Sequence, residues 1–235
     1  MLPQLPLQLA FTDQQSFAQY HAGANLETVA ALKRCARGEG EPYLCLWGEH
    51  GTGKSHLLQA SCREAHGLGK RAAYLPLKAL QDHPPSLLEG LEHADLVCVD
   101  DIETLAGREL WEQAFFHGFN RMREAGTRLI VAGHMPPAQI PVRLPDLRTR
   151  LGWGLILRLK PLSDADKLAA LRLRAHHLGL ELNPQVGQFL LTRYPRDLPS
   201  LWRLLEQLDR ATLAAKRKLT IPFLKQYLEE HSCEP

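Results

Sequence analysis

The octapeptide GEHGTGKS carries three glycines, a lysine and a serine at the spacing of a phosphate-binding loop. Gly48, Gly51 and Gly53 allow backbone conformations that are closed to residues with a Cβ, so successive N–H groups can curve around a phosphate. Lys54 is placed to reach β- and γ-phosphates, and the Ser55 hydroxyl can ligate Mg²⁺. This spacing therefore predicts binding of a nucleotide with Mg²⁺.

The segments on either side of the octapeptide support this interpretation. The apolar run Tyr43–Trp47 predicts a strand before it, and residues 54–66 predict a helix whose N-terminal dipole favours the same anion. Thr52 and His56 complete the set expected to contact nucleotide. The alternative is a glycine-rich turn that matches by chance, which would not require a strand before it and a helix after it.

Two carboxylates follow another apolar run. Leu96–Val99 is uninterrupted, as is typical of a strand buried in a parallel sheet, and Asp100 and Asp101 come directly after it. Because ligands of such sheets lie at the carboxyl ends of the strands, both acids should face the phosphate loop. Asp100 would then hold Mg²⁺ through water, and Asp101 could orient an attacking water.

Three further polar residues lie next to the fourth and fifth strand-like runs, and His134 is predicted to point toward the same site as the acids. His134 follows a strand-like run at 128–132 and is either a γ-phosphate sensor or a turn histidine. Arg148 and Arg150 precede a fifth apolar run. An arginine supplied in trans can accelerate phosphoryl hydrolysis by about 10³ to 10⁵, whereas the alternative is an ordinary surface arginine.

The order of strands and helices predicts an α/β fold. Strand-like runs at 42–47, 72–77, 95–99, 128–132 and 155–159 alternate with helical segments, which predicts a parallel sheet with crossover helices. Asn25 is expected to cap a helix over Leu26–Arg37. After residue 161 only helices are predicted, starting near Ser163, Asn183, Asp197 and Thr220.

Composition excludes several classes of protein. Of 235 residues 45% are hydrophobic, and no run approaches the roughly 18 apolar residues of a membrane span. The N-terminus does not resemble a secretory signal, so a cytoplasmic protein is expected. Five cysteines without a C-x-x-C pair, and eleven histidines without H-E-x-x-H, indicate neither a disulfide framework nor a zinc site.

Charge is distributed unevenly along the chain. Residues 143–218 contain 15 Lys and Arg against 7 Asp and Glu, although the net charge of the whole chain is only +2. The excess indicates either a basic face for phosphates, nucleic acid or an acidic partner, or ordinary solvated helix faces.

The first residues of the chain form a short apolar tail. Gln4 is followed by leucines at alternate positions, Leu5, Leu7 and Leu9. These leucines could anchor in the groove of a partner while Gln4 makes orienting hydrogen bonds, or they could pack back on the domain.

Together these segments resemble the AAA+ ATPases, and within them the DnaA group. The matching segments occur in DnaA order over roughly residues 14–230 and are GEHGTGKSHLLQA, VDDIE, AGHMPPAQI, LPDLRTRLGWGL with KPLSDADK, and YPRDLPSLWRLLEQLD. LRTRLGWGL is the most discriminating of them. The chain is most similar to the Hda family of DnaA regulatory inactivators, because we expect no DNA-binding domain after the helical lid and because the tail looks like the hexapeptide that Hda proteins insert into the sliding clamp.

The resemblance implies an AAA+ domain with a five-stranded parallel sheet over residues 12–160, a helical lid over 161–235 and a clamp-binding tail over 1–11. It assigns Lys54 and Ser55 to the phosphates and Mg²⁺. It also assigns Asp100 and Asp101 to the acidic motif, His134 to the first sensor, Arg150 to an arginine finger and Arg196 to the second sensor. Residues 23–25, from Gly23 through Asn25, are assigned to adenine binding.

The resemblance also implies a function. It indicates a negative regulator of replication initiation that holds ADP or ATP, contacts DnaA and the DNA polymerase III β sliding clamp, and reaches DNA through the clamp near the replisome. His134, where DnaA proteins usually have aspartate, and Asp101, where vigorous ATPases have glutamate, indicate weak or absent intrinsic hydrolysis. Self-association stays open. Alternatives are a DNA-remodelling ATPase of the helicase-loader or transposition-helper type, and a small-molecule kinase.

Overall fold

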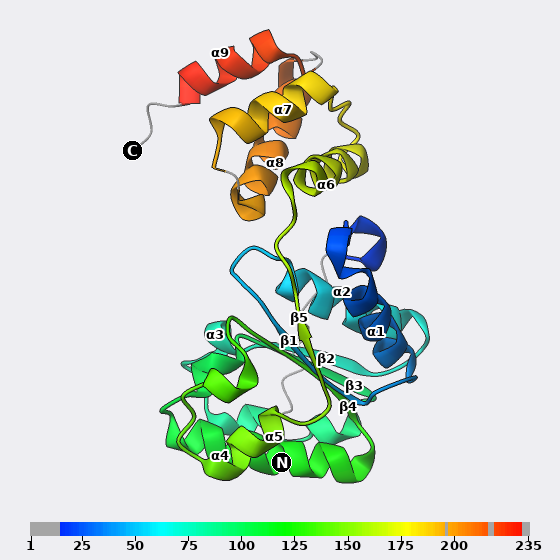
Figure 1. Cartoon of the computed structure of the whole chain (residues 1–235), viewed down its shortest axis with the longest axis vertical. Coiled ribbons are helices and arrows are strands. Elements are labelled where there is room, and N and C mark those ends of the chain that lie inside the picture. The colour runs from blue at the N-terminus through cyan, green and yellow to red at the C-terminus, as the bar shows by residue number, and fades with distance from the viewer. Residues whose placement is uncertain (1–14, 196, 216–218, 232–235) are drawn as a thin grey trace. The chain divides into compact units, whose positions relative to one another are not determined.

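The computed structural model describes residues 15–195, 197–215 and 219–231, and the chain divides into two compact units, Met1–Pro161 and Leu162–Pro235 (Figure 1). All five strands of the described chain belong to the first unit. The second unit is helical. No helix in the described ranges is both long enough and apolar enough to cross a bilayer.

The strands and helices agree closely with the expected ones. The strands are β1 Tyr43–Trp47, β2 Ala72–Pro76, β3 Leu96–Asp100, β4 Arg128–Gly133 and β5 Leu155–Arg158. The helices of the first unit are α1 Leu26–Arg37, α2 Lys54–Gly67, α3 Leu77–Leu80, α4 Glu109–Ala125 and α5 Pro145–Leu151. Those of the second unit are α6 Asp164–His177, α7 Pro184–Arg193, α8 Leu198–Ala215 and α9 Ile221–His231.

The sheet is parallel throughout, with strand order β2-β3-β4-β1-β5. This confirms the predicted five-stranded parallel α/β architecture. Because parallel strands share one carboxyl edge, the segments after β1, β3 and β4 emerge side by side. The phosphate loop, the acids after β3 and His134 are thereby collected at one edge, although 86 residues separate Gly48 from His134 in the sequence.

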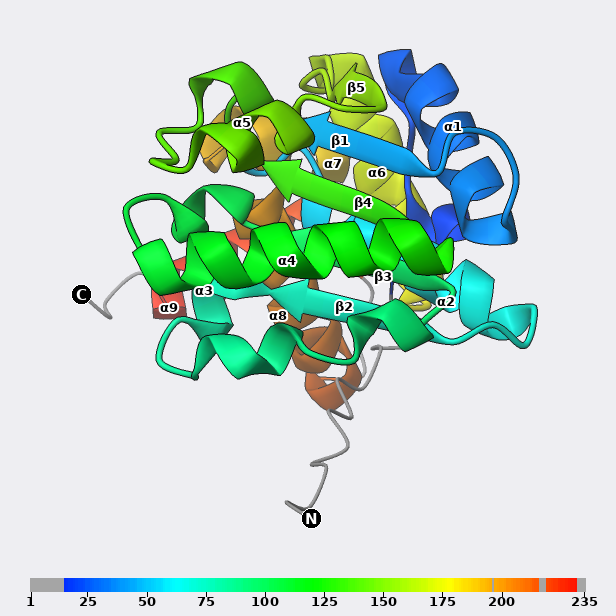
Figure 2. The ribbon, with the colours of Figure 1, turned by 90° about the horizontal axis from the view of Figure 1, so that it is seen from below.

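Both faces of the central strands β3, β4 and β1 are buried, whereas the edge strand β5 is mostly exposed. Along β3, Val97 and Val99 pack into one apolar layer, whereas Leu96 and Cys98 pack into the other. This alternation follows from the period of two in a strand. Uninterrupted apolar runs are therefore required wherever helices cover both faces, as Figure 2 shows for α4 on one side and α1 and α2 on the other.

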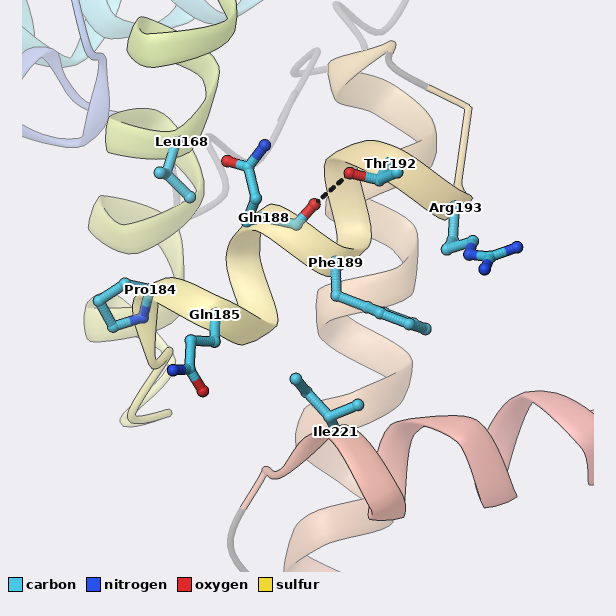
Figure 3. A pocket seen from close by; sticks show the side chains of 8 residues that line it. All are labelled: Leu168, Pro184, Gln185, Gln188, Phe189, Thr192, Arg193 and Ile221. Carbon is cyan, nitrogen blue, oxygen red and sulfur yellow. Dashed lines mark hydrogen bonds between the residues drawn. The ribbon is translucent and has the colours of Figure 1, made fainter.

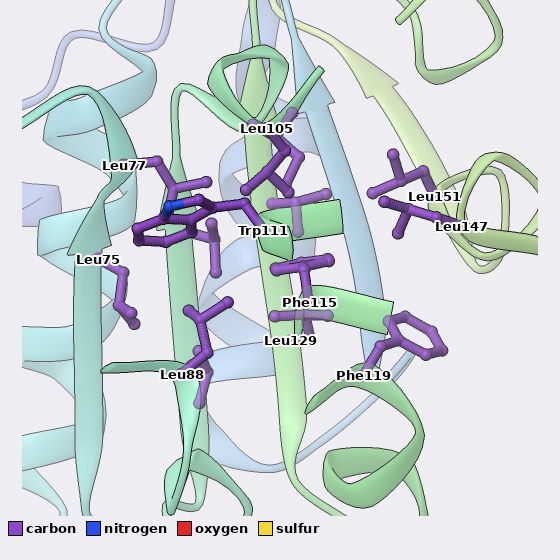
Figure 4. Packing of buried hydrophobic residues seen from close by; sticks show 14 of the residues in the cluster. Leu75, Leu77, Leu88, Leu105, Trp111, Phe115, Phe119, Leu129, Leu147 and Leu151 are labelled. Carbon is purple, nitrogen blue, oxygen red and sulfur yellow. The ribbon is translucent and has the colours of Figure 1, made fainter. Parts of the chain in front are cut away.

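Helix α4 covers its face with aromatic side chains. Trp111, Phe115 and Phe119 are buried at helical spacing and pack against β-strand residues such as Leu129 (Figure 4). Their large apolar area makes α4 the main contributor to that layer.

Two local expectations need correction. Asn25 occupies the N-cap position of α1, but its side chain makes no capping bond because it pairs with the backbone of Lys160. Arg148 and Arg150 lie on α5, a seven-residue helix that begins at Pro145 and that the apolar pattern of the sequence did not indicate. A helix of two turns is too short to show a clear period.

The helical unit begins as its caps predict. Ser163 accepts a hydrogen bond from the N–H of Asp166, and Asn183 accepts one from the N–H of Gln185. Leucines from α6, α7 and α8 form its buried core, including Leu171, Leu190 and Leu205.

Candidate functional site

The phosphate loop is shaped by close backbone approaches that require glycine. A Cβ on Gly48 would lie 2.6 Å from the carbonyl oxygen of Leu159, so the chain after β5 could not pass. Gly53 has a φ of +94° immediately before α2, and a Cβ there would meet the ring of Tyr20 at 2.7 Å. These glycines therefore allow the loop to turn tightly into the N-terminus of α2.

Lys54 is held inside this loop. Its side chain is buried, and its ammonium group donates to the carbonyl oxygens of Gly48 at 2.7 Å and Glu49 at 2.9 Å. Burial lowers the pKa of Lys54, and the carboxylates that follow β3 partly offset that effect. The fold thus positions the ammonium group of Lys54 inside the loop.

The two acids at the carboxyl end of β3, Asp100 as its last residue and Asp101 directly after it, lie in different environments. Asp100 is buried, and its carboxylate accepts hydrogen bonds from the hydroxyl of Tyr74 at 2.9 Å and from the N–H of Asp101 at 3.1 Å. Asp101 is partly exposed and, within the described residues, is the one non-glycine residue with positive φ, 55°. Burial and the neighbouring carboxylates of Asp100 and Glu103 raise the pKa of Asp101. Strained backbone of this kind often occurs at functional sites.

His134 lies beside both Lys54 and the acids, as its position after β4 predicted. Its Nδ1 is 3.4 Å from Lys54 Nζ, and its Nε2 is 3.2 Å from Glu103 Oε1 and 3.6 Å from Asp101 Oδ1. Glu103 was not among the predicted site residues. Its position in VDDIE, two residues after a predicted site residue, is the signal that could have identified it.

Two residues near the N-terminus of the described chain also contact the loop. Tyr20 donates from its hydroxyl to the carbonyl oxygen of Thr52 at 3.2 Å, and its ring lies 5.6 Å from that of His56. The ring of His56 in turn contacts the carbonyl oxygen of Ser16 at 2.9 Å. Tyr20 was not predicted as a site residue; nothing in its local spacing indicated the contact.

The residues expected near adenine are tied to the end of the α/β unit. Gly23 has a φ of +49°, and the buried Asn25 exchanges two hydrogen bonds with Lys160, from Nδ2 to the carbonyl oxygen at 3.0 Å and from the N–H to Oδ1 at 2.8 Å. The observed role of Asn25 is therefore to fix the start of α1 against the chain that leaves β5.

Arg150 is half-buried on α5 and takes no part in the hydrogen bonds of the phosphate loop. Its guanidinium carbon is 3.9 Å from the ring centre of Trp153, which is 37% exposed, and Arg123 approaches the same ring at 5.4 Å. The ring of Phe119 meets Trp153 edge-on at 6.1 Å. Within the described residues no carboxylate or carbonyl accepts a hydrogen bond from Arg150, so its donors can reach an external group.

A buried carboxylate anchors the turn that leads to Arg150. Glu112 on α4 is 1% exposed and accepts hydrogen bonds from the N–H groups of Gly107, Arg143 and Leu144, all at 2.8–3.1 Å. Burial raises the pKa of Glu112, but these three donors outweigh it and hold the pKa below its usual 4.5. The residue thereby ties the start of α5 to the core.

The residues present fit a nucleotide with a hard divalent cation. The loop offers glycine backbone, a buried ammonium group and the start of a 14-residue helix to phosphate oxygens. The exposed hydroxyl of Ser55 and the carboxylates of Asp100 and Asp101 are oxygen ligands of the kind that Mg²⁺ prefers.

Several predicted residues lie outside the described ranges. These are Gln4, Leu5, Leu7 and Leu9 of the tail, and Arg196 of the helical unit.

The helical unit has an open groove of its own. It measures about 660 Å³ and is lined by Leu168 of α6, Phe189 of α7 and Ile221 of α9, with Gln185 and Gln188 among its polar residues (Figure 3). None of the described residues predicted for nucleotide or DnaA lines it.

Comparison with known proteins agrees with both units. Residues 12–158 match the family model of the bacterial DnaA ATPase domain, and residues 164–228 match that of the Hda lid domain. Domain III of the replication initiation protein DnaA from Thermotoga maritima has a TM-score of 0.80 at 21% identity, with 93% of this chain and 97% of that chain covered.

Longer DnaA structures are also similar. AMPPCP-bound DnaA from Aquifex aeolicus has a TM-score of 0.72 at 22% identity, covering 85% of this chain and 65% of that one. A DnaA bound to AMPPCP and single-stranded DNA has a TM-score of 0.70 at 22% identity, covering 86% and 66%. This chain thus spans just under two thirds of those DnaA chains, and at these identities the likeness establishes the fold. By its matches to both family models, the chain belongs to the DnaA-related AAA+ family, with the ATPase domain of bacterial DnaA followed by an Hda-type lid.

Proposed function

We propose that this protein is a regulatory inactivator of DnaA, which limits the initiation of chromosomal replication by promoting hydrolysis of ATP bound to DnaA. The observation that carries the proposal is the joining of a DnaA-type ATPase unit to an Hda-type lid. The guanidinium of Arg150 on α5, which donates to no acceptor among the described residues, supports the same function, because it is left to act on a nucleotide held by another protein.

In this proposal the protein's own nucleotide, ADP or ATP, has a structural role. Lys54 and the start of α2 bind its phosphates, while Ser55 and Asp100 hold Mg²⁺, which neutralises phosphate charge when bound. Asp101 orients the attacking water in hydrolysis of the protein's own nucleotide, a reaction that we expect to be slow or absent. In the same proposal Gly23 and Asn25 are assigned to adenine, and Arg196 is assigned to the second sensor.

Arg150 supplies the catalytic contribution to DnaA. Its planar guanidinium stabilises the negative charge that develops on the transferring γ-phosphoryl group. Stacking on Trp153 limits the orientations of the side chain before it meets the partner, which lowers the entropy cost of placing it.

The tail supplies the second contact. Leu5, Leu7 and Leu9, oriented by Gln4, bind a groove of the β sliding clamp, which places the protein on DNA indirectly. A tether of this kind raises the effective concentration of Arg150 near DnaA, so neither contact has to be strong alone.

The central experiment measures ATP hydrolysis by DnaA in the presence of clamp loaded on DNA. We expect Arg150→Ala to reduce the stimulation by about 10³-fold, as for other arginine fingers. Arg148→Ala is the matched control on the same helix and should retain most of the stimulation, because that guanidinium donates to Val142 within the protein. Full stimulation by Arg150→Ala would contradict the proposal.

A separate experiment tests the clamp. Gln4→Ala, and a chain lacking residues 1–9, should lose co-purification with the clamp while binding nucleotide normally. If the truncated chain still stimulates hydrolysis fully on clamp-loaded DNA, the tethering part of the proposal is wrong.

A DNA-remodelling ATPase is the alternative, favoured by the basic composition of residues 143–218. That function requires multiple turnovers of ATP by this protein alone, stimulated by single-stranded DNA and weakened steeply by salt. Such turnover, together with no effect on DnaA, would replace the proposal.

A further inference from the structure

Strand β5 is an open edge of the sheet. It pairs with β1 on one side only, at the end of the strand order (Figure 2). Leu155 is 39% and Ile156 44% exposed, and Arg158 is exposed as well. At the opposite edge, β2 buries Tyr74 and Leu75 and ends in a proline, which has no N–H to offer. β5 contains neither proline nor lysine, the residues that commonly protect an edge from further pairing.

The backbone groups on the open side of β5 belong to alternate residues. Leu159 donates its N–H to the carbonyl oxygen of Trp47 at 2.7 Å, so the backbone of Leu159 faces β1. Successive residues of a strand direct their backbone groups to opposite sides, so those of Ile156 and Arg158 point away from β1. Within the described residues none of these N–H and C=O groups has a hydrogen-bond partner. They offer the pattern of donors and acceptors that an added strand requires.

The two faces of β5 differ in chemistry. Leu155 and Leu157 lie on one face, where Leu157 packs partly into the apolar layer beneath α1 and α2. Ile156 and Arg158 lie on the other face, and the guanidinium carbon of Arg158 is 5.0 Å from the ring centre of Trp47. A strand added here would place its own two rows of side chains beside these, because neighbouring strands align their side chains on each face. Such a strand therefore needs aliphatic side chains on one face.

The surroundings of β5 are basic. Residues 147–163 contain four Lys and Arg and no Asp or Glu. Within the described chain Arg158 makes no ion pair with a carboxylate. A second copy of this chain would bring the same positive charges edge to edge, which is repulsive, whereas an acidic segment would be attracted. Charge therefore indicates an acidic occupant for the other face of the added strand.

The tail of this chain is the competing occupant. Pro3 and Pro6 are three positions apart, an odd number, so in an extended segment that includes both, their nitrogens face opposite sides. One proline nitrogen, which carries no hydrogen, would then face β5 in either orientation. Residues 1–12 also contain no Asp or Glu to meet Arg158. These features favour a separate partner.

We propose that β5 is a docking edge for an extended acidic segment of a partner protein, which adds to the sheet as a sixth strand and alternates aliphatic with acidic side chains. The aliphatic side chains lie beside Leu155 and Leu157, and the acidic ones beside Arg158. Main-chain hydrogen bonds to Ile156 and Arg158 give affinity, and the alternating side chains give specificity. The contact uses neither the nucleotide nor Arg150, so it goes beyond the proposed function.

The first test uses as its probe a fluorescein-labelled peptide of four Glu-Val repeats, capped at both ends, and measures anisotropy with the whole protein. We expect Arg158→Glu to weaken binding about 10-fold, since an attractive charge contact becomes repulsive. Arg210→Glu, the same charge change at an exposed position of α8, is the control and should retain binding within about 2-fold. A peptide of four Lys-Val repeats should not bind.

The second test distinguishes strand pairing from ionic attraction. Ile156→Pro removes an N–H that faces away from β1, so thermal melts should show an intact fold while peptide binding falls about 10-fold. Methylation of alternate peptide nitrogens gives the converse test on the unaltered protein. One set of methylated positions should abolish binding and the other should leave it, because only alternate N–H groups of an added strand face β5.

Other results would overturn the inference. Equal binding by both methylated peptides, or no binding by the unaltered chain, would show that no strand is added. Displacement of the peptide by oligothymidine, with binding unchanged in Ile156→Pro, would assign the surface to nucleic acid. Much tighter peptide binding after deletion of residues 1–9 would make the tail the occupant, and a dimer that Ile156→Pro dissociates would make it a second copy. Absent peptide binding with normal stimulation of DnaA would remove this inference and leave the proposed function.

Discussion

At the phosphate loop Lys54 is 5% exposed and its ammonium group donates to two backbone carbonyls, whereas the half-buried Arg150 lies against the ring of Trp153. The two cations belong to the same compact unit, yet Lys54 is buried and Arg150 is only half-buried. A buried ammonium serves a ligand that enters the protein. A half-buried guanidinium that lies on an aromatic ring and keeps its donors unused suits a group on another molecule.

Lys54 and Arg150 are held in place by different kinds of interaction. Hydrogen bonds to buried carbonyls give Lys54 a definite place at the cost of desolvation. Arg150 is oriented by one ring face and by the helix that carries it, while its donors stay accessible. Substitution of Arg150 should therefore leave nucleotide affinity largely unchanged, and substitution of Lys54 should leave the contribution of Arg150 to DnaA largely unchanged.

The largest effect is expected at the loop. Lys54→Ala should weaken nucleotide affinity by about 100-fold, because charge-assisted hydrogen bonds to phosphate are lost. Calorimetry with ADP measures it, and Lys225→Ala, at an exposed lysine of α9, is the control. Since the change also leaves two loop carbonyls without their donor, circular dichroism should verify the fold. Unchanged affinity would show that the loop does not bind phosphate.

Substitution of Glu112 should loosen the turn before α5, the helix that carries Arg150. Glu112→Ala leaves three part-buried N–H groups without their acceptor and should lower the free energy of unfolding by about 3 kcal/mol, measured in urea. Nucleotide affinity at the loop should change less than stimulation of DnaA. Equal losses of both would indicate that the two regions are not separable.

Acid should destabilise the fold by protonating Glu112. Because the pKa of folded Glu112 lies below its usual 4.5, its ionised form stabilises the fold above about pH 4.5, and this contribution is lost as pH falls through the folded pKa. Glu112→Gln should be less stable than the unaltered chain at pH 7, and the difference should shrink toward pH 3. A constant difference across this range would contradict the assignment.

A smaller effect is expected at the ring beneath Arg150. Trp153→Ala should reduce maximal stimulation of DnaA hydrolysis by about 10-fold, whereas Trp153→Phe should stay within about 3-fold, because a smaller ring keeps part of the cation–π contact. ADP affinity should not change in either variant. Loss of stimulation that is as large in Phe as in Ala would mean that Trp153 acts by a contact other than its ring face.

The smallest effect concerns Asp101. Its φ of 55° disfavours a side chain, so Asp101→Gly should raise the free energy of unfolding by about 0.5 kcal/mol despite greater freedom in the unfolded chain. Removal of one of three neighbouring carboxylates acts in the same direction. A loss of stability in thermal melts would show that the Asp101 carboxylate supports the fold.

Much of the framework was predictable from the sequence. The five strands and the helical unit follow from apolar runs, from caps at Ser163 and Asn183, and from the glycines of the loop, each a local signal. The short helix α5 was not predictable, because two turns show no clear period. The side-chain bond of Asn25 to Lys160 spans 135 positions, and no local rule reports such a contact.

The sequence by itself determined the parallel sheet, the phosphate loop and the family, because these depend on residue types at fixed short spacing. Only the tertiary structure decided that Glu103 grips His134, that His134 meets Lys54 across 80 residues, and that Arg150 lies on Trp153. Those contacts depend on which strand ends lie side by side and on the rotamers that packing allows. Spacing along the chain does not specify either of these.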